Sequence, residues 1–295
     1  MVLFSVATDT FFTADNLSLL LEQSVVIGLL ALGQTIIVLT AGIDLANGAI
    51  AVLGTLVMAK NAATTGHAAL GLVGALSLCT ALGTASGGLV TRMRLPPFIV
   101  TLGMLTVVSA SGRLYSQSRN YPVNAQLLGV FGRGFHVGPL ALSYGVVLML
   151  ALYAVVEYAL TQTAWGRHVR AVGGNSEAAR RMGISVDRTL VGAYAAGALL
   201  YGLAAWAALG RIPNADANAY QTANLESITA VVLGGTSLFG GRGGPVGTLL
   251  GTLIVAVLRS GLTQAGIDSL YQEVATGILV VLAVALDAVA RRGRP

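Results

Sequence analysis

Long apolar stretches dominate this sequence and restrict what it can fold into. A helix needs about 20 mostly apolar residues to cross a bilayer core about 30 Å thick, because each residue rises about 1.5 Å. Barrel strands would alternate over about ten residues, a pattern that this sequence lacks, so an all-α, polytopic membrane helical bundle is predicted. The candidate spans number about nine: 17–41, 45–61, 67–91, 96–117, 138–160, 189–211, 226–240, 244–264 and 270–290. Of these, 226–240 is short enough to be re-entrant or interrupted.

The composition excludes the soluble classes of protein. Hydrophobic residues make up 55% of the chain and charged residues only 10%, whereas a soluble domain has about a quarter charged residues. There is too little charge to wet a globular surface, so a soluble enzyme, a nucleic-acid binder and a disordered tail are all excluded. We therefore treat 1–295 as a single transmembrane domain, in contact with membrane lipid.

Basic residues predict the orientation of the chain. They gather in the polar segment 161–188, in the tail after 290 and in the short link before Pro96, and the positive-inside rule places all three on the cytoplasmic side. With nine spans and an inner C-terminus, the N-terminus is expected outside. These basic residues are Arg167, Arg170, Arg180, Arg181, Arg188, Arg291, Arg292, Arg294, Arg92 and Arg94.

Two Gly-rich segments, 193 residues apart, are similar in sequence. AGIDLANGAIAVLGTL (41–56) and GGTSLFGGRGGPVGTL (234–249) share six identities in sixteen positions. A duplication would give two related halves, as in many transporters, with each Gly-rich break buried or facing a water-filled cavity. Chance similarity and two tight surface turns are the alternatives, and the sequence leaves them open.

No catalytic motif, metal site or cofactor site is predicted. The nearest run to a Walker A sequence is GTSLFGGR (235–242), which lacks the Gly-Lys-Ser/Thr that holds phosphates. The histidines His67, His136 and His168 lie far apart without metal-ligand spacing, and no G-x-S-x-G occurs. The chain is therefore not expected to be an enzyme.

Ionisable residues between or within apolar stretches are costly and often functional. Asp44 lies between two such stretches, and we favour its capping the helix that begins near Leu45 over direct substrate contact. Glu226 is expected to cap the helix of 226–240, and Arg259 to extend toward a membrane interface. Gly243, Gly247 and Gly251 form GxxxGxxxG on one predicted helix face, which favours close packing within the chain over a homodimer contact.

The segment 161–188 is too polar to span and too long for a simple turn. SEAARRMG (176–183) predicts a short helix with Ser176 as N-cap and Gly183 as its stop. Such a cytoplasmic helix can receive force from a soluble partner, and it can equally be a solvated, positively charged loop that fixes topology. Periodicity alone does not choose between these interpretations.

Four motifs carry a resemblance to a known family. From about residue 11 to 286, the chain resembles the inner-membrane permease of bacterial ATP-binding-cassette sugar importers of the ribose/xylose type. In that family a further transmembrane helix usually precedes the segment matching FFTADNLSLLLEQ (11–23), so we expect either a truncated or mis-assigned start or a shorter permease. The motifs are LTAGIDLANGAIAVL (39–53), LPPFIVTLGML (95–105), GRHVRAVGGNSEAARRMGI (166–184) and AVVLGGTSLFGGRGGPVGTLLG (230–251).

The resemblance implies a permease subunit of the bacterial inner membrane that works as a pair with a second permease chain. A cytoplasmic ATP-binding subunit would hydrolyse ATP, a periplasmic substrate-binding protein would deliver the solute, and no nucleic acid would be bound. The Gly-rich segments 41–48 and 234–243 would lie near the translocation path. The ATPase-coupling positions within 161–188 would be Gly173, Gly174, Asn175, Glu177, Ala178, Ala179, Arg180 and Gly183.

The expected substrate is a sugar or a similar neutral, polyhydroxylated small molecule, which needs hydrogen-bonding side chains along its path. Each candidate could instead satisfy a neighbouring backbone carbonyl, the commoner role of a polar residue in a membrane helix. Two alternatives stay open: a branched-chain amino-acid permease of the same superfamily, and an ion-coupled secondary transporter with Asp44 as proton carrier. The candidate path residues are Gln34, Asp44, Asn47, Thr236 and Ser237.

Overall fold

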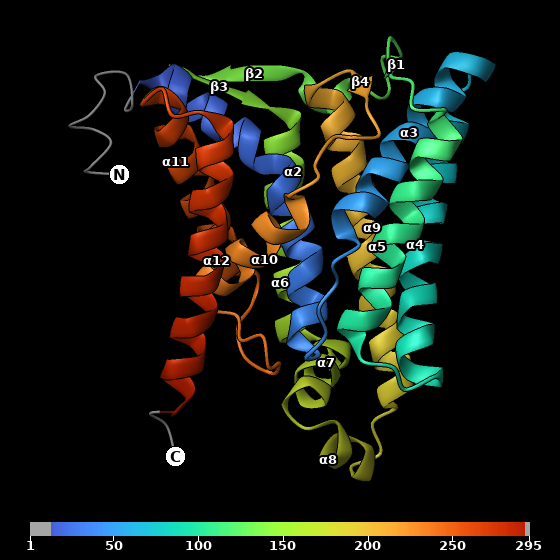
Figure 1. The fold of residues 1–295 in the computed structure, drawn as a ribbon, viewed down its shortest axis with the longest axis vertical. Helices are drawn as coiled ribbons and strands as arrows, with labels where there is room; N and C mark the ends of the chain where they lie inside the picture. The colour runs from blue at the N-terminus through green and yellow to red at the C-terminus, as the bar shows by residue number, and fades with distance from the viewer. Residues whose placement is uncertain (1–12, 293–295) are drawn as a thin grey trace.

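The computed structural model describes residues 13–292, and over this range the chain is a bundle of helices that run roughly along one axis (Figure 1). The all-α membrane bundle predicted from the sequence is confirmed. Its helices are α2 (Ala14–Leu39), α3 (Asn47–Thr65), α4 (Ala68–Arg92), α5 (Pro97–Ser116), α6 (Tyr144–Gln162), α7 (Ala164–Gly174), α8 (Ser176–Arg181), α9 (Val186–Arg211), α10 (Ala223–Leu233), α11 (Pro245–Gln264) and α12 (Ser269–Arg292).

The number of membrane crossings is only partly confirmed. Within residues 13–292, six helices are long and apolar enough to cross a membrane, namely α2, α4, α5, α6, α9 and α11. The other three predicted stretches also contain a helix, but α10 has only 11 residues and the apolar part of α12 covers 270–282. The interruption expected in 226–240 is confirmed because α10 ends at Leu233. Nine full crossings stay a prediction.

Short strands cover one end of the bundle. The strand β1 (Tyr121–Pro122) pairs with β4 (Asn214–Ala215), and η1 (Val130–Gly132) leads into a hairpin of β2 (Gly134–Val137) and β3 (Leu140–Ser143). The stretch 138–160 was predicted to be helical throughout, and this was wrong for its first six residues. Val137 pairs with Leu140, so Gly138 and Pro139 form a two-residue hairpin turn, in which Gly138 takes a φ of +60°.

The three basic segments lie together at the opposite end of the molecule. The link between α4 and α5, the pair α7 and α8, and the last turn of α12 are all at the bottom of Figure 1. A cavity of about 830 Å³ is lined by Arg92, Arg94 and Arg180, so two of these segments are adjacent. This agrees with the predicted orientation, and we call this end the inner end and the strand-covered end the outer end. Arg294 lies outside the described residues.

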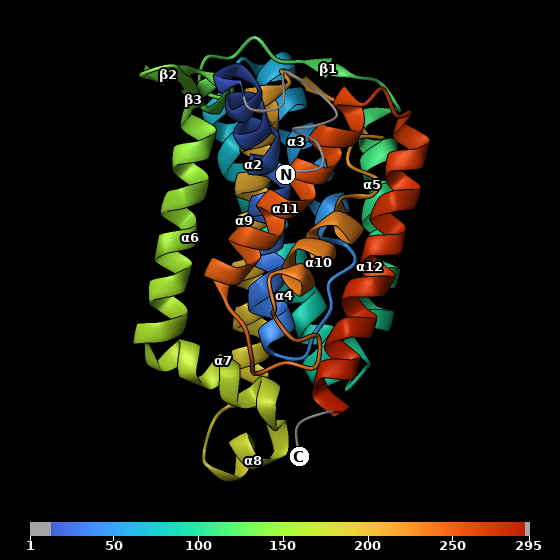
Figure 2. The same cartoon turned by 90° about the vertical axis from the view of Figure 1, so that its left-hand side faces the viewer.

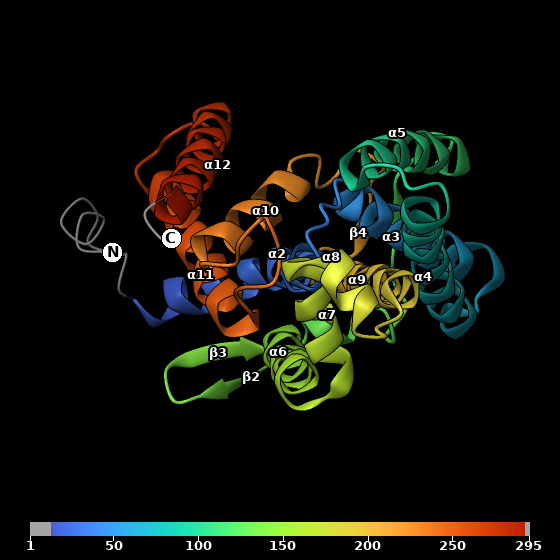
Figure 3. The same cartoon turned by 90° about the horizontal axis from the view of Figure 1, so that it is seen from below.

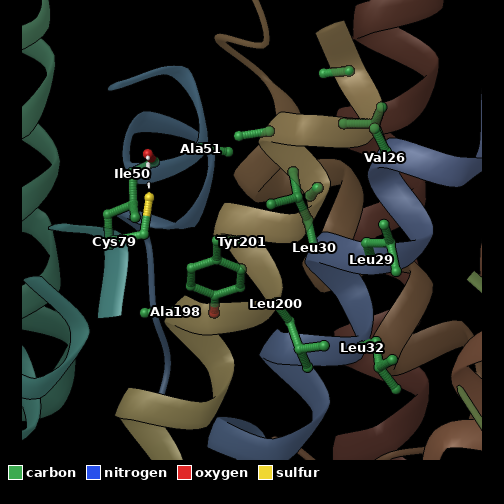
Figure 4. Close-up of a cluster of buried hydrophobic side chains, with 14 of the residues drawn as sticks. Val26, Leu29, Leu30, Leu32, Ile50, Ala51, Cys79, Ala198, Leu200 and Tyr201 are labelled. Atoms are coloured by element: carbon green, nitrogen blue, oxygen red, sulfur yellow. Dashed lines mark hydrogen bonds between the residues drawn. The ribbon is translucent and has the colours of Figure 1, made fainter. Parts of the chain in front are cut away.

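The central helix of the bundle is α2, which lies between α9 on one side and α10 and α11 on the other (Figure 3). Its side chains Leu29 and Leu30 are fully buried and pack near Tyr201 of α9 (Figure 4). The single cysteine, Cys79 of α4, is buried in the same cluster and its Sγ donates to the carbonyl oxygen of Ile50, 3.5 Å away. The core is therefore built by α2, α3, α4 and α9.

The peripheral helices present apolar side chains outward, as a lipid-facing surface requires. Along α5, Phe98 and Ile99 are more than half exposed, and Val155 of α6 is exposed as well. Figure 2 shows α6 and α12 on opposite sides of the bundle. A soluble bundle would place polar residues at these positions, so the exposed apolar faces are consistent with lipid as the solvent.

Close packing of α11 on α10 depends on two glycines. A Cβ at Gly251 would lie 1.9 Å from the carbonyl oxygen of Ala230, and one at Gly247 would lie 2.1 Å from that of Gly234. The predicted packing within the chain is confirmed for these two. Gly243 is not on the helix, contrary to the prediction, because α11 begins at Pro245, and Gly243 precedes it with a φ of +113°.

The polar segment 161–188 forms two short helices below the bundle. The second, α8, is the helix predicted from SEAARRMG, and Gly183 follows it with a φ of +83°. The predicted N-cap was wrong by one residue: Asn175 is extended and its Oδ1 accepts from the N–H of Ala178 at 2.9 Å, while Ser176 is already helical. The first helix, α7, was not predicted and is capped by Thr163.

Candidate functional site

The chain between α2 and α3 is not helical, and we call residues 40–46 the first break. At its start Ala41 takes a φ of +62°, and the N–H of Gly42 donates to the carbonyl oxygen of Ile37 at 3.1 Å. This pattern is a Schellman motif, which ends a helix while pairing its last carbonyls. The backbone that follows runs through the interior, where Asp44 and Ala46 are fully buried.

The chain between α10 and α11 ends its helix in the same manner, and we call residues 234–244 the second break. Gly235 takes a φ of +79°, and the N–H of Thr236 donates to the carbonyl oxygen of Val231 at 3.1 Å. Each of the two helices is followed by a residue with positive φ, Ala41 after α2 and Gly235 after α10. These two residues lie 194 positions apart, whereas the two similar sequence segments are offset by 193. Both segments share a local conformation, and the duplication of the whole chain stays a prediction.

The two breaks are in direct contact. The N–H of Gly241 in the second break donates to the carbonyl oxygen of Leu39, the last residue of α2, at 2.9 Å. A Cβ at Gly240 would lie 2.7 Å from the backbone nitrogen of Ala41. Segments nearly 200 residues apart in the sequence therefore meet backbone to backbone, which only glycine permits at such a distance.

Gln34 and Asp44 pair across the first break. With the Gln34 amide oriented to satisfy both bonds, its nitrogen donates to the carbonyl oxygen of Asp44 and its oxygen accepts from the N–H of Asp44, both at 3.1 Å. Tyr201 OH lies 3.4 Å from the same amide. The Asp44 carboxylate accepts from the N–H of Ala46 at 2.8 Å through Oδ1, and its Oδ2 has no hydrogen-bond partner within the described residues. The predicted helix cap was wrong: α3 begins at Asn47 with Ala46 as its N-cap and no side chain caps it, because the N–H that Asp44 binds precedes the helix.

The other three candidate path residues, Asn47, Thr236 and Ser237, also make hydrogen bonds within the second break or between helices that adjoin the breaks. The Asn47 amide nitrogen donates to the hydroxyl of Ser227 at 2.7 Å, which ties α3 to α10. Thr236 accepts from the N–H of Gly244 at 3.2 Å and Ser237 accepts from that of Phe239 at 3.4 Å. All five predicted path residues are buried. Gln34 pairs with a neighbouring backbone carbonyl, whereas Asp44, Thr236 and Ser237 accept from backbone N–H groups and Asn47 binds a side chain. A role in the path stays a prediction for each.

The helix α7 reaches both breaks. A Cβ at Gly173 would lie 1.8 Å from the carbonyl oxygen of Leu39 and 2.8 Å from the nitrogen of Gly241. Arg170, one turn earlier, donates from Nη1 to the carbonyl oxygen of Gly243 at 2.8 Å. The predicted coupling segment and the predicted path segments are thus joined through backbone contacts near the inner end.

The helix α8 presents an exposed face at the inner end. Ala179 is buried against Val172 and Val186 and holds α8 to the bundle. Its charged side chains are solvated: Glu177 pairs with Arg181, and Arg180 pairs with Asp187 at 3.4 Å. Of the remaining predicted coupling positions, Gly174, Asn175, Ala178 and Gly183 are exposed and Gly173 is buried. The segment therefore offers a polar surface away from the membrane-spanning helices.

A second cavity, of about 710 Å³, lies toward the outer end, and we call it the outer cavity. Its floor holds an ion pair between Glu226 of α10 and Arg259 of α11, with Nη1 at 2.9 Å and 2.8 Å from the two carboxylate oxygens. Sequence reasoning assigned Glu226 to a helix cap and Arg259 to a membrane interface, and missed the pair. The signal was present: two opposite charges occur in consecutive apolar stretches, where unpaired charges are costly.

Comparison with known proteins identifies the family. Residues 16–284 match the family model described as the permease component of the branched-chain amino acid transport system. The fructose import permease protein of Rhizobium meliloti is 44% identical over 94% of this chain and 79% of its own length. The ribose import permease protein of Escherichia coli K12 is 35% identical over 97% of this chain and 90% of its own.

A third relative is the galactose/methyl galactoside import permease protein of Escherichia coli K12, which is 31% identical over 94% of this chain and 88% of its own length. No solved structure matches. The relatives and the apolar helices together describe a multi-pass protein of the bacterial inner membrane. The chain belongs to the family of permease components described for branched-chain amino acid transport systems, and it is similar throughout to sugar import permeases.

Proposed function

We propose that this chain is the permease subunit of an ATP-driven importer of a sugar or a similar polyhydroxylated molecule. The observation that carries the proposal is the similarity to sugar import permeases over nearly the whole chain. The alternative, branched-chain amino-acid transport, has support only in the description of the family model. ATP hydrolysis belongs to a separate cytoplasmic subunit in this proposal, because the sequence has no phosphate-binding loop.

The proposed mechanism transmits force through α7. An ATP-binding subunit would bind the exposed face of α8 and move it as ATP is bound and hydrolysed. Because Gly173 contacts Leu39 and Gly241, a tilt of α7 acts on both breaks together. Both breaks interrupt the helical hydrogen bonding inside the bundle, so helices can reorient there with little loss of backbone pairing.

The complete importer would contain further subunits. A second permease chain, identical or related, would complete the path, and a periplasmic substrate-binding protein would deliver the solute to the outer end. The proposal also includes nine membrane crossings, with the N-terminal end of α2 on the outer side of the membrane. Solute would pass from the outer cavity toward the breaks, with Gln34, Asp44, Asn47, Thr236 and Ser237 close to its route.

The test is affinity purification of the chain from its native membrane, with identification of its partners and an ATPase assay. We expect a nucleotide-binding subunit to co-purify and to be lost from the E177A/R180A double variant. These two residues form only exposed ion pairs, each worth about 0–1 kcal/mol, so the variant will fold. R188A, an exposed change at the start of α9, is the matched control. A chain that purifies alone and moves solute on an ion gradient would disprove the proposal.

A further inference from the structure

The outer cavity has the size and lining of a small-molecule site. Its volume of about 710 Å³ lies within the range of roughly 300–1,000 Å³ that is usual for ligand pockets. It is lined by residues of α2, α3, α9, α10, α11 and the segment between β4 and α10. Its polar wall residues include Gln23, Ser24, Asn218, Gln221, Thr222 and Thr252.

The ion pair in this cavity is unequally exposed. The Glu226 side chain is 9% exposed and the Arg259 side chain 54%. Glu226 also accepts from the hydroxyl of Thr222 at 3.0 Å, so three donor contacts hold its carboxylate in place. Glu226 is fixed by this arrangement, and the guanidinium of Arg259 is the part of the pair that is open to the cavity.

Arg259 uses only one of its nitrogens in the pair. Nη1 contacts both oxygens of Glu226, while Nε and Nη2 donate to no acceptor in the part of the chain that the structure describes. An arginine in an apolar helix of a membrane protein carries a large desolvation cost, and such residues are typically found where a solute passes. The unused N–H groups form the planar fork that binds paired oxygens.

The lining of the outer cavity has no net charge, which indicates the class of ligand. Its charged residues are two acidic ones, Glu226 and Asp216, and two basic ones, Arg259 and Arg211. An anionic solute would compete with Glu226 for Arg259, and a cationic solute would compete with Arg259 for Glu226. A neutral solute with adjacent hydroxyl groups can accept from the guanidinium and donate to the carboxylate without separating them. The side-chain amides of Gln23 and Gln221 in the wall supply further donors and acceptors of the same neutral kind.

The predicted path residues do not provide this environment. Gln34, Asp44, Asn47, Thr236 and Ser237 are not among the residues that line the outer cavity. Their polar groups contact the backbone of the breaks or side chains of adjacent helices. The outer cavity, in contrast, is lined by the N–H groups of Arg259 that the ion pair leaves unused.

We propose that Glu226 and Arg259 form a subsite in the outer cavity that binds two adjacent hydroxyl groups of the transported polyol. This rests on the proposed function, since it assigns the place where the solute is held after it enters from the outer end. Arg259 donates from Nε and Nη2 to the hydroxyl oxygens. Glu226 accepts a hydrogen bond from a hydroxyl group and keeps the guanidinium in position.

The test measures how each variant responds to the loss of single hydroxyl groups. Uptake of D-fructose, D-ribose and D-galactose into vesicles that contain the full importer identifies a transported sugar. Monodeoxy derivatives of that sugar are then compared in the wild type and in R259K, which keeps a cation beside Glu226 but lacks the fork. The delivering protein is the same throughout, so its own preferences cancel from the comparison.

We expect the wild type to lose about 10- to 100-fold in kcat/KM for at least one deoxy sugar, as for a lost hydrogen bond to a charged group. In R259K and in the neutral pair E226Q/R259Q, the ratio of kcat/KM for the parent sugar to that for this deoxy sugar should be about 10- to 100-fold smaller than in the wild type. R113K is the control and should behave as the wild type, because Arg113 lines the neighbouring cavity beside α5 and is not among the residues that line the outer cavity.

If the ratio of kcat/KM for the parent sugar to that for the deoxy sugar were the same in R259K and in the wild type, the proposed subsite would be wrong. The ion pair would then only link α10 to α11. Should the wild type move none of the three sugars but move leucine, the proposed function itself would fail. These two failures are distinguishable because the first requires a working sugar importer.

Discussion

The backbone N–H of Gly241 donates a hydrogen bond to the carbonyl oxygen of Leu39 across 2.9 Å. This bond joins the loop between α10 and α11 to the last residue of α2, so the two interrupted regions of the bundle form one unit. Gly173 of α7 lies against both of these residues. A displacement of the inner helices therefore reaches both breaks at a single point, which gives coupling a short physical route.

The first prediction compares two adjacent glycines of α7. A Cβ at Gly173 would lie 1.8 Å from the Leu39 carbonyl oxygen, whereas one at Gly174 would meet nothing within 4 Å. G173A should separate α7 from the breaks at a cost of about 1–3 kcal/mol and reduce ATP-dependent uptake by about tenfold or more. G174A leaves the contact with Leu39 intact and should lower uptake less than G173A does. Uptake per transporter in native-membrane vesicles measures both, and equal uptake would contradict the role of Gly173.

Much of the fold could be predicted from the sequence because lipid imposes simple rules. Apolar length located a helix in each of the nine stretches, and the basic residues of 161–188 indicated the inner end. The start of α6 was missed because apolar length does not separate a β3 strand from a helix. The N-cap at Asn175 was missed because Asn and Ser are nearly equivalent caps, and only the extended backbone at Asn175 distinguishes them.

The candidate site was less predictable, for a physical reason. Contacts such as Gly173 with Leu39, or Glu226 with Arg259, join residues far apart in the sequence, and composition gives no information on such distances. Glu226 and Arg259 were each explained locally, one as a cap and the other by the length of its side chain. Two opposite charges in consecutive apolar stretches should be considered as a pair before either is explained alone.

The second prediction concerns stability. A Cβ at Gly251 would lie 1.9 Å from the Ala230 carbonyl oxygen, so G251A should force α10 and α11 apart and destabilise the protein by about 1–3 kcal/mol. Gly103 of α5 has open space around it, and G103A should be neutral or stabilising by up to about 1 kcal/mol. Thermal unfolding of the purified protein in detergent measures both. A lower midpoint for G103A than for G251A would contradict this account of the packing.

The third prediction separates the proposed importer from an ion-coupled transporter. Asn at position 44 keeps the acceptor for the Ala46 N–H, so D44N should retain part of the ATP-dependent uptake. A protonophore should not change the ratio of uptake by D44N to uptake by the wild type. D44L leaves that buried N–H unpaired, at a cost of about 1–3 kcal/mol, and should lower the amount of folded protein. Uptake with and without protonophore is the measurement. Loss of all gradient-dependent transport in D44N would favour Asp44 as a proton carrier.

The fourth prediction tests the link between α7 and the second break. Arg170 donates from Nη1 to the carbonyl oxygen of Gly243 at 2.8 Å. Arg167, on the same helix, is exposed, and its side chain makes no hydrogen bond to the described residues. R170M removes a charge-assisted hydrogen bond worth about 1.5–3 kcal/mol, and R167M removes the same charge without a contact. We expect R170M to retain ATPase activity in the assembled importer while uptake falls about tenfold or more, because hydrolysis in the partner no longer moves the second break.

R167M should keep the ratio of solute moved to ATP hydrolysed at the wild-type value. The two activities are measured on the same vesicles, so a change in protein amount alters both equally and leaves their ratio unchanged. If R170M lowered ATPase activity and uptake in proportion, Arg170 would act in binding the ATP-binding subunit. Only a fall in uptake at preserved hydrolysis supports transmission through Gly243, since that is the result expected when the partner works and the break does not follow it.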